Sequence, residues 1–520
     1  MDKHIRLLDC TLRDGGHIVQ GKFGENVIRN TIEYLVEAGI DIIEVGFLWN
    51  EETDINTARY YSLDDVRRIL PINHGKSKFA LMADFVNLDH LEPYDGTIEY
   101  IRLSFKRWRI DWGIETARSL MEKGYKVFIN PVNNNVYTDE QYIEVLEKVN
   151  ELHPYGFSIV DTFGTMREND LSHRYYLVEN NLLSDITIGV HLHDNLGLAY
   201  SLAQHITQIA NPKRNIVIDG SLLGMGRVPG NLCIEHIMDY MNYQFGANYA
   251  MEPAYDAIDD YIAPIKEEKP WGYAIPYALS AKYHLHRTYA EYLMGKKRLK
   301  TKDIQRILAQ IPTSEAESFD EDFIEKLYME YMDVAYDDRN DIKKLEERIN
   351  DKNVLIIAPG KSIRESEKKI AQVAKNHLVI SVNFVPDFIS SDIVFLTNTK
   401  RYPAIKSSGG EGKLLITSNL MRDVDNPDFI VSYNEVVHFN GEYCDDSTLI
   451  LLNLLNRLGK KEVCLAGFDG HKDGVLSFYD DSFDRSKMSS NNGDKVKAIL
   501  KSVFFDMEMI FLTDSAYMDK

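Results

Sequence analysis

The chain has 520 residues, 44% of them hydrophobic and 27% charged, which is too long for one hydrophobic core, so we expect two or three domains. Its formal net charge of -21 is spread along the chain, which argues against nucleic acid or an anionic membrane as the main partner. No apolar run approaches the ~20 residues that span a bilayer, no apolar signal core opens the chain, and four separated cysteines form no CxxC pair, so we expect a cytoplasmic protein with reduced thiols.

The first half of the chain alternates short apolar runs with amphipathic helical patterns. Eight of the runs have the length and composition of buried strands, and several of the helical patterns end in a glycine, which terminates helices well. The runs are IRLLDCTL, DIIEVGFL, KFALMADF, TIEYIRLSF, KVFINPV, FSIVDTFG, ITIGVHLHD and NIVIDGSL. Eight strand-then-helix units within residues 1–250 predict an α/β fold, the TIM (β/α)8 barrel, whose active sites lie at the carboxyl ends of the strands.

Two further regions follow the predicted barrel. Residues 251–350 have helical patterns, which we interpret as a helical extension of the barrel and a linker. Residues 351–520 open with NVLIIAPGKSI and continue with five more strand-like runs, which predicts a separate Rossmann-like α/β domain of unknown role. The opening turn either holds a phosphate of a nucleotide or nucleotide-sugar or is an ordinary tight turn. Asp387 and Asp469, at strand ends, are candidates for ribose or metal contacts.

Two strands of the predicted barrel carry polar residues that together suit a metal ion. His191 and His193 lie at i and i+2 of the seventh predicted strand, so their side chains project from one face, and Asp14 follows the first strand. An HxH pair alone is a modest signal, but strands of the same parity contribute side chains to one layer of such a barrel. Two imidazoles and a carboxylate suit a divalent cation, for which we expect Mn²⁺, with Mg²⁺, Co²⁺ or Zn²⁺ as alternatives.

Arg13 and His17 lie beside this predicted metal site in the sequence. Arg13 is either an ion-pair partner in the barrel or a permanently charged group that stabilises an enolate oxygen, and its place at a strand end favours the second role. A lone loop histidine is usually idle. So close to a metal-bound keto acid, however, His17 is a candidate general base near neutral pH.

Four segments in this order resemble the DRE-type TIM-barrel metallolyases, the HMGL-like family: LLDCTLRDGGHIVQGKF, IEVGF, HLHDNLGLA and GSLLGMGRVPGN. The likeness covers about residues 3–290. The family includes 4-hydroxy-2-oxovalerate aldolase, 3-hydroxy-3-methylglutaryl-CoA lyase, and isopropylmalate and homocitrate synthases. The resemblance implies that Asp14, His191 and His193 are metal ligands and that Arg13 is the catalytic arginine. We expect Glu44 of IEVGF to bind substrate together with Arg13.

Within that family the aldolase branch resembles the chain most. RDGGH places His17 where the aldolases have a catalytic histidine, and KPWGYAIPYALS resembles the segment whose tyrosine assists that base, which points to Tyr273. IVDTFG resembles the strand whose hydroxyl residue helps to hold the pyruvate carboxylate, which points to Thr162. The glycine-rich loop departs from the usual G-x-G-x-G-A-G-N pattern at Val228 and Pro229, and it lacks the catalytic cysteine of the CoA lyases.

The sequence therefore predicts an aldolase that joins or splits pyruvate, or a related 2-keto acid, and an aldehyde through a metal-stabilised enolate. Two alternatives stay open: a Claisen-type acyl-CoA condensing synthase of the same superfamily, and a non-catalytic scaffold that carries a nucleotide-sugar-binding domain. The complete set of site residues argues against the scaffold. We also expect the chain to form a homo-oligomer.

Overall fold

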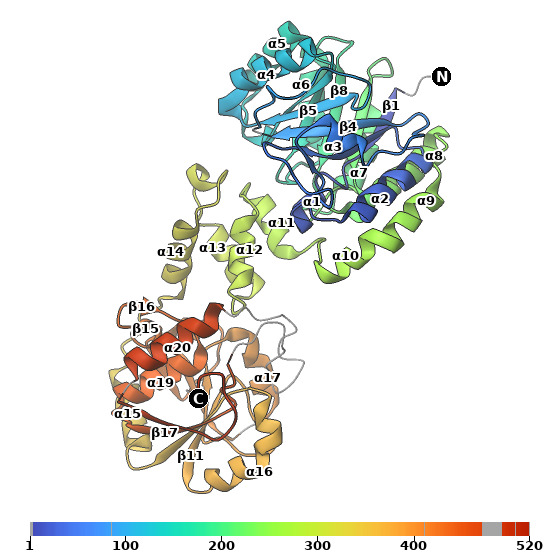
Figure 1. Ribbon diagram of the computed structural model, residues 1–520. Helices are drawn as coiled ribbons and strands as arrows, with labels where there is room; N and C mark the ends of the chain where they lie inside the picture. The colour runs from blue at the N-terminus through green and yellow to red at the C-terminus, as the bar shows by residue number, and fades with distance from the viewer. Residues whose placement is uncertain (1–3, 85, 410, 471–490, 505, 519–520) are drawn as a thin grey trace. The chain divides into compact units, whose positions relative to one another are not determined.

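The computed structural model describes residues 4–84, 86–409, 411–470, 491–504 and 506–518 (Figure 1). The chain forms two compact units, of which the first comprises Met1–Glu291 and Ile311–Phe319 and the second comprises Tyr292–Gln310 and Asp320–Lys520. In the described ranges, no helix has the length and apolar character needed to cross a membrane. That residues 251–350 form a helical extension of the barrel and a linker stays a prediction.

The first unit is built on a closed parallel barrel. Its strand order is β1-β9-β8-β7-β6-β5-β4-β2, and pairing between β1 and β2 closes the ring. The short β3 pairs with the end of β2 at Phe47 and Leu48, beyond the residues of β2 that pair with β1. Because β3 is counted as a strand, the seventh and eighth predicted strands are β8 and β9. The strands are β1 (Ile5–Asp9), β2 (Ile42–Leu48), β3 (Arg59–Tyr60), β4 (Lys78–Asp84), β5 (Tyr100–Phe105), β6 (Lys126–Pro131), β7 (Gly156–Asp161), β8 (Thr187–Leu192) and β9 (Ile216–Gly220). The predicted TIM barrel is confirmed.

Helices surround the strands because each strand is buried on both faces and needs an apolar cover. For example, α4 packs against β5 and β6, and α8 packs against β1 and β9. The helices of this part of the chain are α1 (Gly16–Val19), α2 (Glu25–Glu37), α3 (Leu63–Arg67), α4 (Ile110–Glu122), α5 (Asp139–Leu152), α6 (Glu168–Asn181), α7 (Ala199–Ile209) and α8 (Ile234–Phe245). Because the helices cover the outside of the barrel, the polar residues at the carboxyl ends of the strands remain available to form a functional site.

Helices also dominate the stretch after the barrel. They are α9 (Met251–Ala257), α10 (Ala263–Glu268), α11 (Ile275–Lys282), α12 (Thr288–Gly295), α13 (Thr301–Leu308), α14 (Glu321–Met332) and α15 (Arg339–Ile349). α9 packs against α2 of the barrel, whereas α13 and α14 contact each other within the second unit.

The second unit contains an open parallel sheet of order β14-β13-β12-β11-β10-β17-β18. Its strands are β10 (Asn353–Ile357), β11 (His377–Val382), β12 (Ile393–Leu396), β13 (Lys413–Thr417), β14 (Phe429–Val431), β17 (Glu462–Ala466) and β18 (Glu508–Phe511), and the hairpin β15 (His438–Phe439) and β16 (Glu442–Tyr443) lies outside this sheet. Its helices are α16 (Ser362–Ala374), α17 (Tyr402–Ser407), α18 (Tyr433–Val437), α19 (Ser447–Arg457) and α20 (Asn491–Val503). The chain builds the sheet outward from β10 to β14 and then returns to β17 on the other side of β10. This confirms the second α/β domain.

Candidate metal centre

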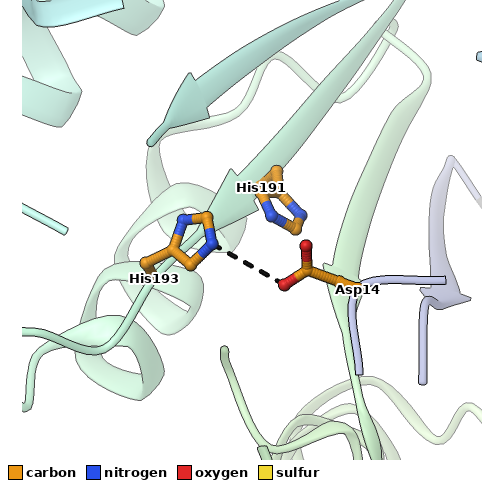
Figure 2. A group of neighbouring side chains, drawn as sticks. All are labelled: Asp14, His191 and His193. Atoms are coloured by element: carbon orange, nitrogen blue, oxygen red, sulfur yellow. Dashed lines mark ion pairs between the residues drawn. The ribbon is translucent and has the colours of Figure 1, made fainter. Parts of the chain in front are cut away.

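Three buried side chains meet at the carboxyl ends of β1 and β8. Asp14 follows β1, His191 lies near the end of β8, and His193 comes directly after that strand. One ligand atom from each residue lies within 4.8 Å of the others. Figure 2 shows the two imidazole rings and the carboxylate turned toward one another, with His193 Nε2 3.7 Å from Asp14 Oδ2. The strand spacing of two residues places both rings on one face, as the sequence predicts.

Hydrogen bonds hold both imidazoles in the orientation that a metal requires. His191 Nδ1 donates to Asp219 Oδ2 over 2.9 Å, and His193 Nδ1 donates to the Asp161 carbonyl over 2.9 Å. Each ring therefore keeps the lone pair of its Nε2 for the shared space. Burial lowers the pKa of His191, which favours the neutral, ligating form. Such second partners fix the tautomer of metal-binding histidines in proteins.

Asp14 is held as a carboxylate. Arg13 NH1 donates to Asp14 Oδ1 over 2.7 Å, and Asn231 Nδ2 donates to Asp14 Oδ2 over 2.7 Å. Although burial opposes the charge, Arg13 and His193 lower the pKa of Asp14 well below its usual value. The Oδ1 atom of Asn231 is buried and finds no hydrogen-bond partner among the described residues. An anionic ligand, two imidazoles and a spare amide oxygen fit a divalent cation.

Glycine lets the loop after β9 approach this centre closely. A Cβ atom on Gly226 would lie 2.8 Å from Asp14 Oδ2 and 2.4 Å from Asn231 Nδ2. Real side chains do not tolerate such distances, so a larger residue at position 226 would push the loop away from Asp14. Gly226 of GMGRVPGN thus allows the loop that carries Asn231 to lie against Asp14.

A buried network of ion pairs between side chains lies next to the centre and holds the guanidinium of Arg13 in place. Arg13 Nε donates to Glu44 Oε2 over 2.6 Å, and Arg102 NH1 donates to the same oxygen over 3.2 Å. Arg102 NH2 also donates to Asp219, the partner of His191. Arg13 is therefore connected through Glu44 and Arg102 to Asp219, the residue that orients the His191 ring. Glu44 is fully buried and contacts Arg13, whereas its predicted contact with substrate stays a prediction.

His17 lies beside the centre, in the short helix α1. Its Nε2 is 3.8 Å from Asp14 Oδ1, its ring packs at 5.6 Å against Phe47, and 33% of its side chain is exposed. Burial of the rest of the ring, together with Arg227 and Arg13, lowers the pKa of His17 in spite of Asp14. The lowered pKa favours the neutral imidazole near pH 7.

The two remaining predicted site residues have different surroundings. Thr162 follows β7, and its Oγ1 accepts a hydrogen bond from the Asn133 backbone N–H over 2.8 Å. Tyr273 precedes α11 and is 59% exposed. Thr162 therefore lies at the same end of the barrel as the centre, whereas the Tyr273 side chain is largely in contact with solvent. The roles predicted for both stay predictions.

Three contributors to the centre, Arg102, Asp219 and Asn231, are absent from the set predicted from the sequence. Asp219 stands at the end of the apolar run NIVID, and Asn231 ends the glycine-rich loop, so both positions carried a usable signal. Arg102 lies inside β5 and is 1% exposed, and a single basic residue in an apolar strand does not indicate its partners.

Removing the charge from Asp219 should weaken metal binding. We expect Asp219→Asn to lower Mn²⁺ affinity by roughly 10- to 100-fold, because a neutral amide polarises the His191 ring less. Titration of the metal-free protein with Mn²⁺ measures the change. Asp185→Asn is the matched control, since Asp185 also pairs with a histidine, His153 at 2.8 Å, but on the surface. Equal Mn²⁺ affinity in Asp219→Asn and wild type would contradict the role of Asp219.

Comparison with known proteins agrees with the architecture of the first unit. Residues 4–257 match the family model described as HMGL-like. A 4-hydroxy-2-oxovalerate aldolase from Geobacillus genomosp. 3 is 23% identical over 278 residues, covering 49% of this chain and 78% of that protein. A 4-hydroxy-2-oxovalerate aldolase from Chloroflexus aggregans is 24% identical over 359 residues, covering 64% and 95%. An oxaloacetate decarboxylase from Mycobacterium tuberculosis is 22% identical over 232 residues, covering 44% and 67%.

Proposed function

From the match of residues 4–257 to the HMGL-like family model, we propose that the chain is a divalent-metal-dependent aldolase. The reaction forms or cleaves the C–C bond between an aldehyde and pyruvate or a related 2-keto acid. The observation that carries the proposal is the buried set of Asp14, His191 and His193, with Arg13 bonded to Asp14 and His17 beside it. The distant relationship to 4-hydroxy-2-oxovalerate aldolases supports the same chemistry.

Asp14, His191 and His193, with Asn231 Oδ1 as a further oxygen, would hold the cation, and we propose Mn²⁺. When bound, the cation supplies a Lewis acid for the carbonyl of the keto acid. The centre is buried, so charges act strongly there.

Arg13 and His17 supply the remaining chemistry. The guanidinium of Arg13 is fixed by Glu44 and Asp14 and is the group that stabilises negative charge on the enolate oxygen. In the cleavage direction, neutral His17 accepts the proton of the 4-hydroxyl as the C–C bond breaks, and in condensation it returns that proton to the new alkoxide. We assign the keto-acid carboxylate to Thr162, and assistance to His17 to Tyr273.

A substrate screen tests the proposed function directly. The full-length protein, loaded with Mn²⁺, is incubated with pyruvate and a panel of simple and sugar aldehydes, and the loss of pyruvate is followed. A parallel assay with acyl-CoA and 2-keto acids follows the release of free thiol. Aldol formation without thiol release supports the aldolase. Thiol release without aldol formation would instead identify a Claisen-type synthase.

We expect Arg13→Lys to keep its metal but to lower kcat by roughly 10- to 100-fold. A lysine ammonium is a point charge and cannot contact Glu44, Asp14 and a substrate oxygen with the fork geometry of guanidinium. Metal content and steady-state kinetics measure the two effects separately. Arg29→Lys, which alters a half-exposed pair with Glu25 on α2, is the matched control. Near-normal turnover in Arg13→Lys would show that Arg13 has a structural role only.

A further inference from the structure

The second unit contains a cavity of about 470 Å³ at the carboxyl ends of its central strands. Residues that follow β10, β11, β12 and β17 line it, namely Ala358, Asn383, Asn398 and Gly467. Between β10 and β17 the direction in which the chain builds the sheet reverses. Open α/β sheets bind ligands at this switch point, and the volume lies within the range of small-molecule sites.

Two glycines allow the loops after β10 and β17 to meet at the cavity. Gly360 N donates to the Gly467 carbonyl over 3.0 Å, and a Cβ on Gly360 would lie 2.3 Å from that oxygen. A Cβ on Gly467, whose φ is +71°, would lie 2.1 Å from the Ala358 carbonyl. Any larger side chain at either position would force the loops apart, so the shape of the cavity depends on both glycines.

The N-terminus of α16 is already satisfied by the protein itself. The Ser362 N–H donates to Asp469 Oδ2 over 2.9 Å, and the Ser362 hydroxyl donates to the other carboxylate oxygen. A carboxylate therefore occupies the place where a phosphate would bind a helix N-terminus. An anionic ligand of this cavity must be recognised by other groups.

Arg298 is such a group. Its side chain is 9% exposed, its Nε lies 3.1 Å from Asp445 Oδ2, and its NH2 donates to the Asp445 carbonyl. Arg298 lines the cavity, and its NH1 is buried and has no hydrogen-bond partner in the described part of the chain. A buried charged donor without a partner is costly. A ligand oxygen would complete the fork, since guanidinium binds phosphate well.

Other parts of the lining suit the remainder of a nucleotide. Tyr443 and Phe468 supply aromatic surface, and the hydroxyl of Tyr443 is held by the hydroxyl of Tyr433 at 2.9 Å. Asn383 and Ser447 form a polar stretch, joined by a hydrogen bond of 2.8 Å from Asn383 Nδ2 to Ser447 Oγ. The cavity thus combines a cation for phosphate, polar groups for ribose and rings for a base.

We propose that this cavity binds a nucleotide, with Arg298 NH1 donating to a phosphate oxygen. The proposal concerns the second unit alone and does not depend on the aldolase chemistry of the barrel.

Calorimetric titration of the full chain with ADP, GDP, CDP, UDP and dTDP tests the proposal, with inorganic phosphate and the five nucleosides as separate arms. We expect one of the diphosphates to bind in the sub-millimolar range and its nucleoside to bind at least about tenfold more weakly, as expected for a lost charge-assisted hydrogen bond. Absence of binding by every diphosphate, or a nucleoside that binds as tightly as its diphosphate, would overturn the proposal. Inorganic phosphate that binds as tightly as the nucleotide would reduce the cavity to a simple anion site.

Variants locate the bound nucleotide. Arg298→Gln should weaken binding by roughly ten- to hundredfold, whereas Arg306→Gln, a half-exposed arginine of α13, should leave it unchanged. Because Arg298→Gln leaves Asp445 without its ion-pair partner and risks misfolding, Lys495→Ala provides a second test. Lys495 lines the cavity as a second cation for the phosphate, and 40% of its side chain is exposed, so we expect Lys495→Ala to fold and to bind the diphosphate more weakly. Wild-type affinity in folded Arg298→Gln, or in Lys495→Ala if Arg298→Gln does not fold, would contradict the proposed site.

Discussion

His191→Ala is expected to yield a folded barrel that has lost most of its metal, with aldolase activity reduced by about 10³-fold or more. The reduction follows from the several kcal/mol that a Lewis acid contributes to such a transition state. His191 is one of only two imidazoles in the set with Asp14, and its Nδ1 partner Asp219 aims its Nε2 into the centre. Asp14→Ala should behave in the same way, because it removes the anionic ligand. Metal analysis of the purified variants and their kcat measure the two effects.

The control for this experiment is His173→Ala. His173 lies on α6, 58% of its side chain is exposed, and it pairs with Asp139 at 2.9 Å, so its loss removes an imidazole without touching the centre. Circular dichroism establishes that each variant is folded. Metal content equal to that of the wild type in both His191→Ala and Asp14→Ala would contradict the assigned ligands.

His17→Ala should lower kcat for aldol cleavage by roughly 10²- to 10⁴-fold while metal binding persists. This is the usual contribution of a positioned general base. His17 is partly exposed, its Nε2 lies 3.8 Å from Asp14 Oδ1, and we propose that it reaches the substrate hydroxyl without serving as a metal ligand. Steady-state kinetics on an aldol substrate found by the screen measure the loss.

The same variant separates proton transfer from enolate stabilisation. Exchange of the pyruvate methyl protons and decarboxylation of oxaloacetate depend on Arg13 and the metal, so His17→Ala should keep part of both activities. His153→Ala, with 54% of its side chain exposed in a surface pair with Asp185, is the matched control. Cleavage at the wild-type rate by His17→Ala would make the histidine an idle residue and remove the strongest argument for the aldolase branch.

The sequence by itself was sufficient for the eight barrel strands and for six strands of the second sheet, because each is a short apolar run bounded by polar residues or turns. It did not predict β3 or β18. β3 has only two residues, too few to form a recognisable run. β18 does contain most of an apolar run, MIFL, but it was not singled out as a strand, and the structure places it at the sheet edge with its residues at least partly exposed. The hairpin of β15 and β16 is as short as β3 and was missed for the same reason as β3.

The metal ligands were predictable from local patterns, whereas their partners were decided by the tertiary structure. A period of two places His191 and His193 on one face. Asp14 was predicted at the carboxyl end of the first strand, and the structure places it in the turn that follows β1, at that same end of the barrel. The contacts that orient these ligands join residues far apart in the chain: His191 to Asp219 across 28 positions, and Asn231 to Asp14 across 217. Closure of the barrel creates these contacts, and no periodicity in the sequence records which distant polar residues become neighbours when the strands close into a ring.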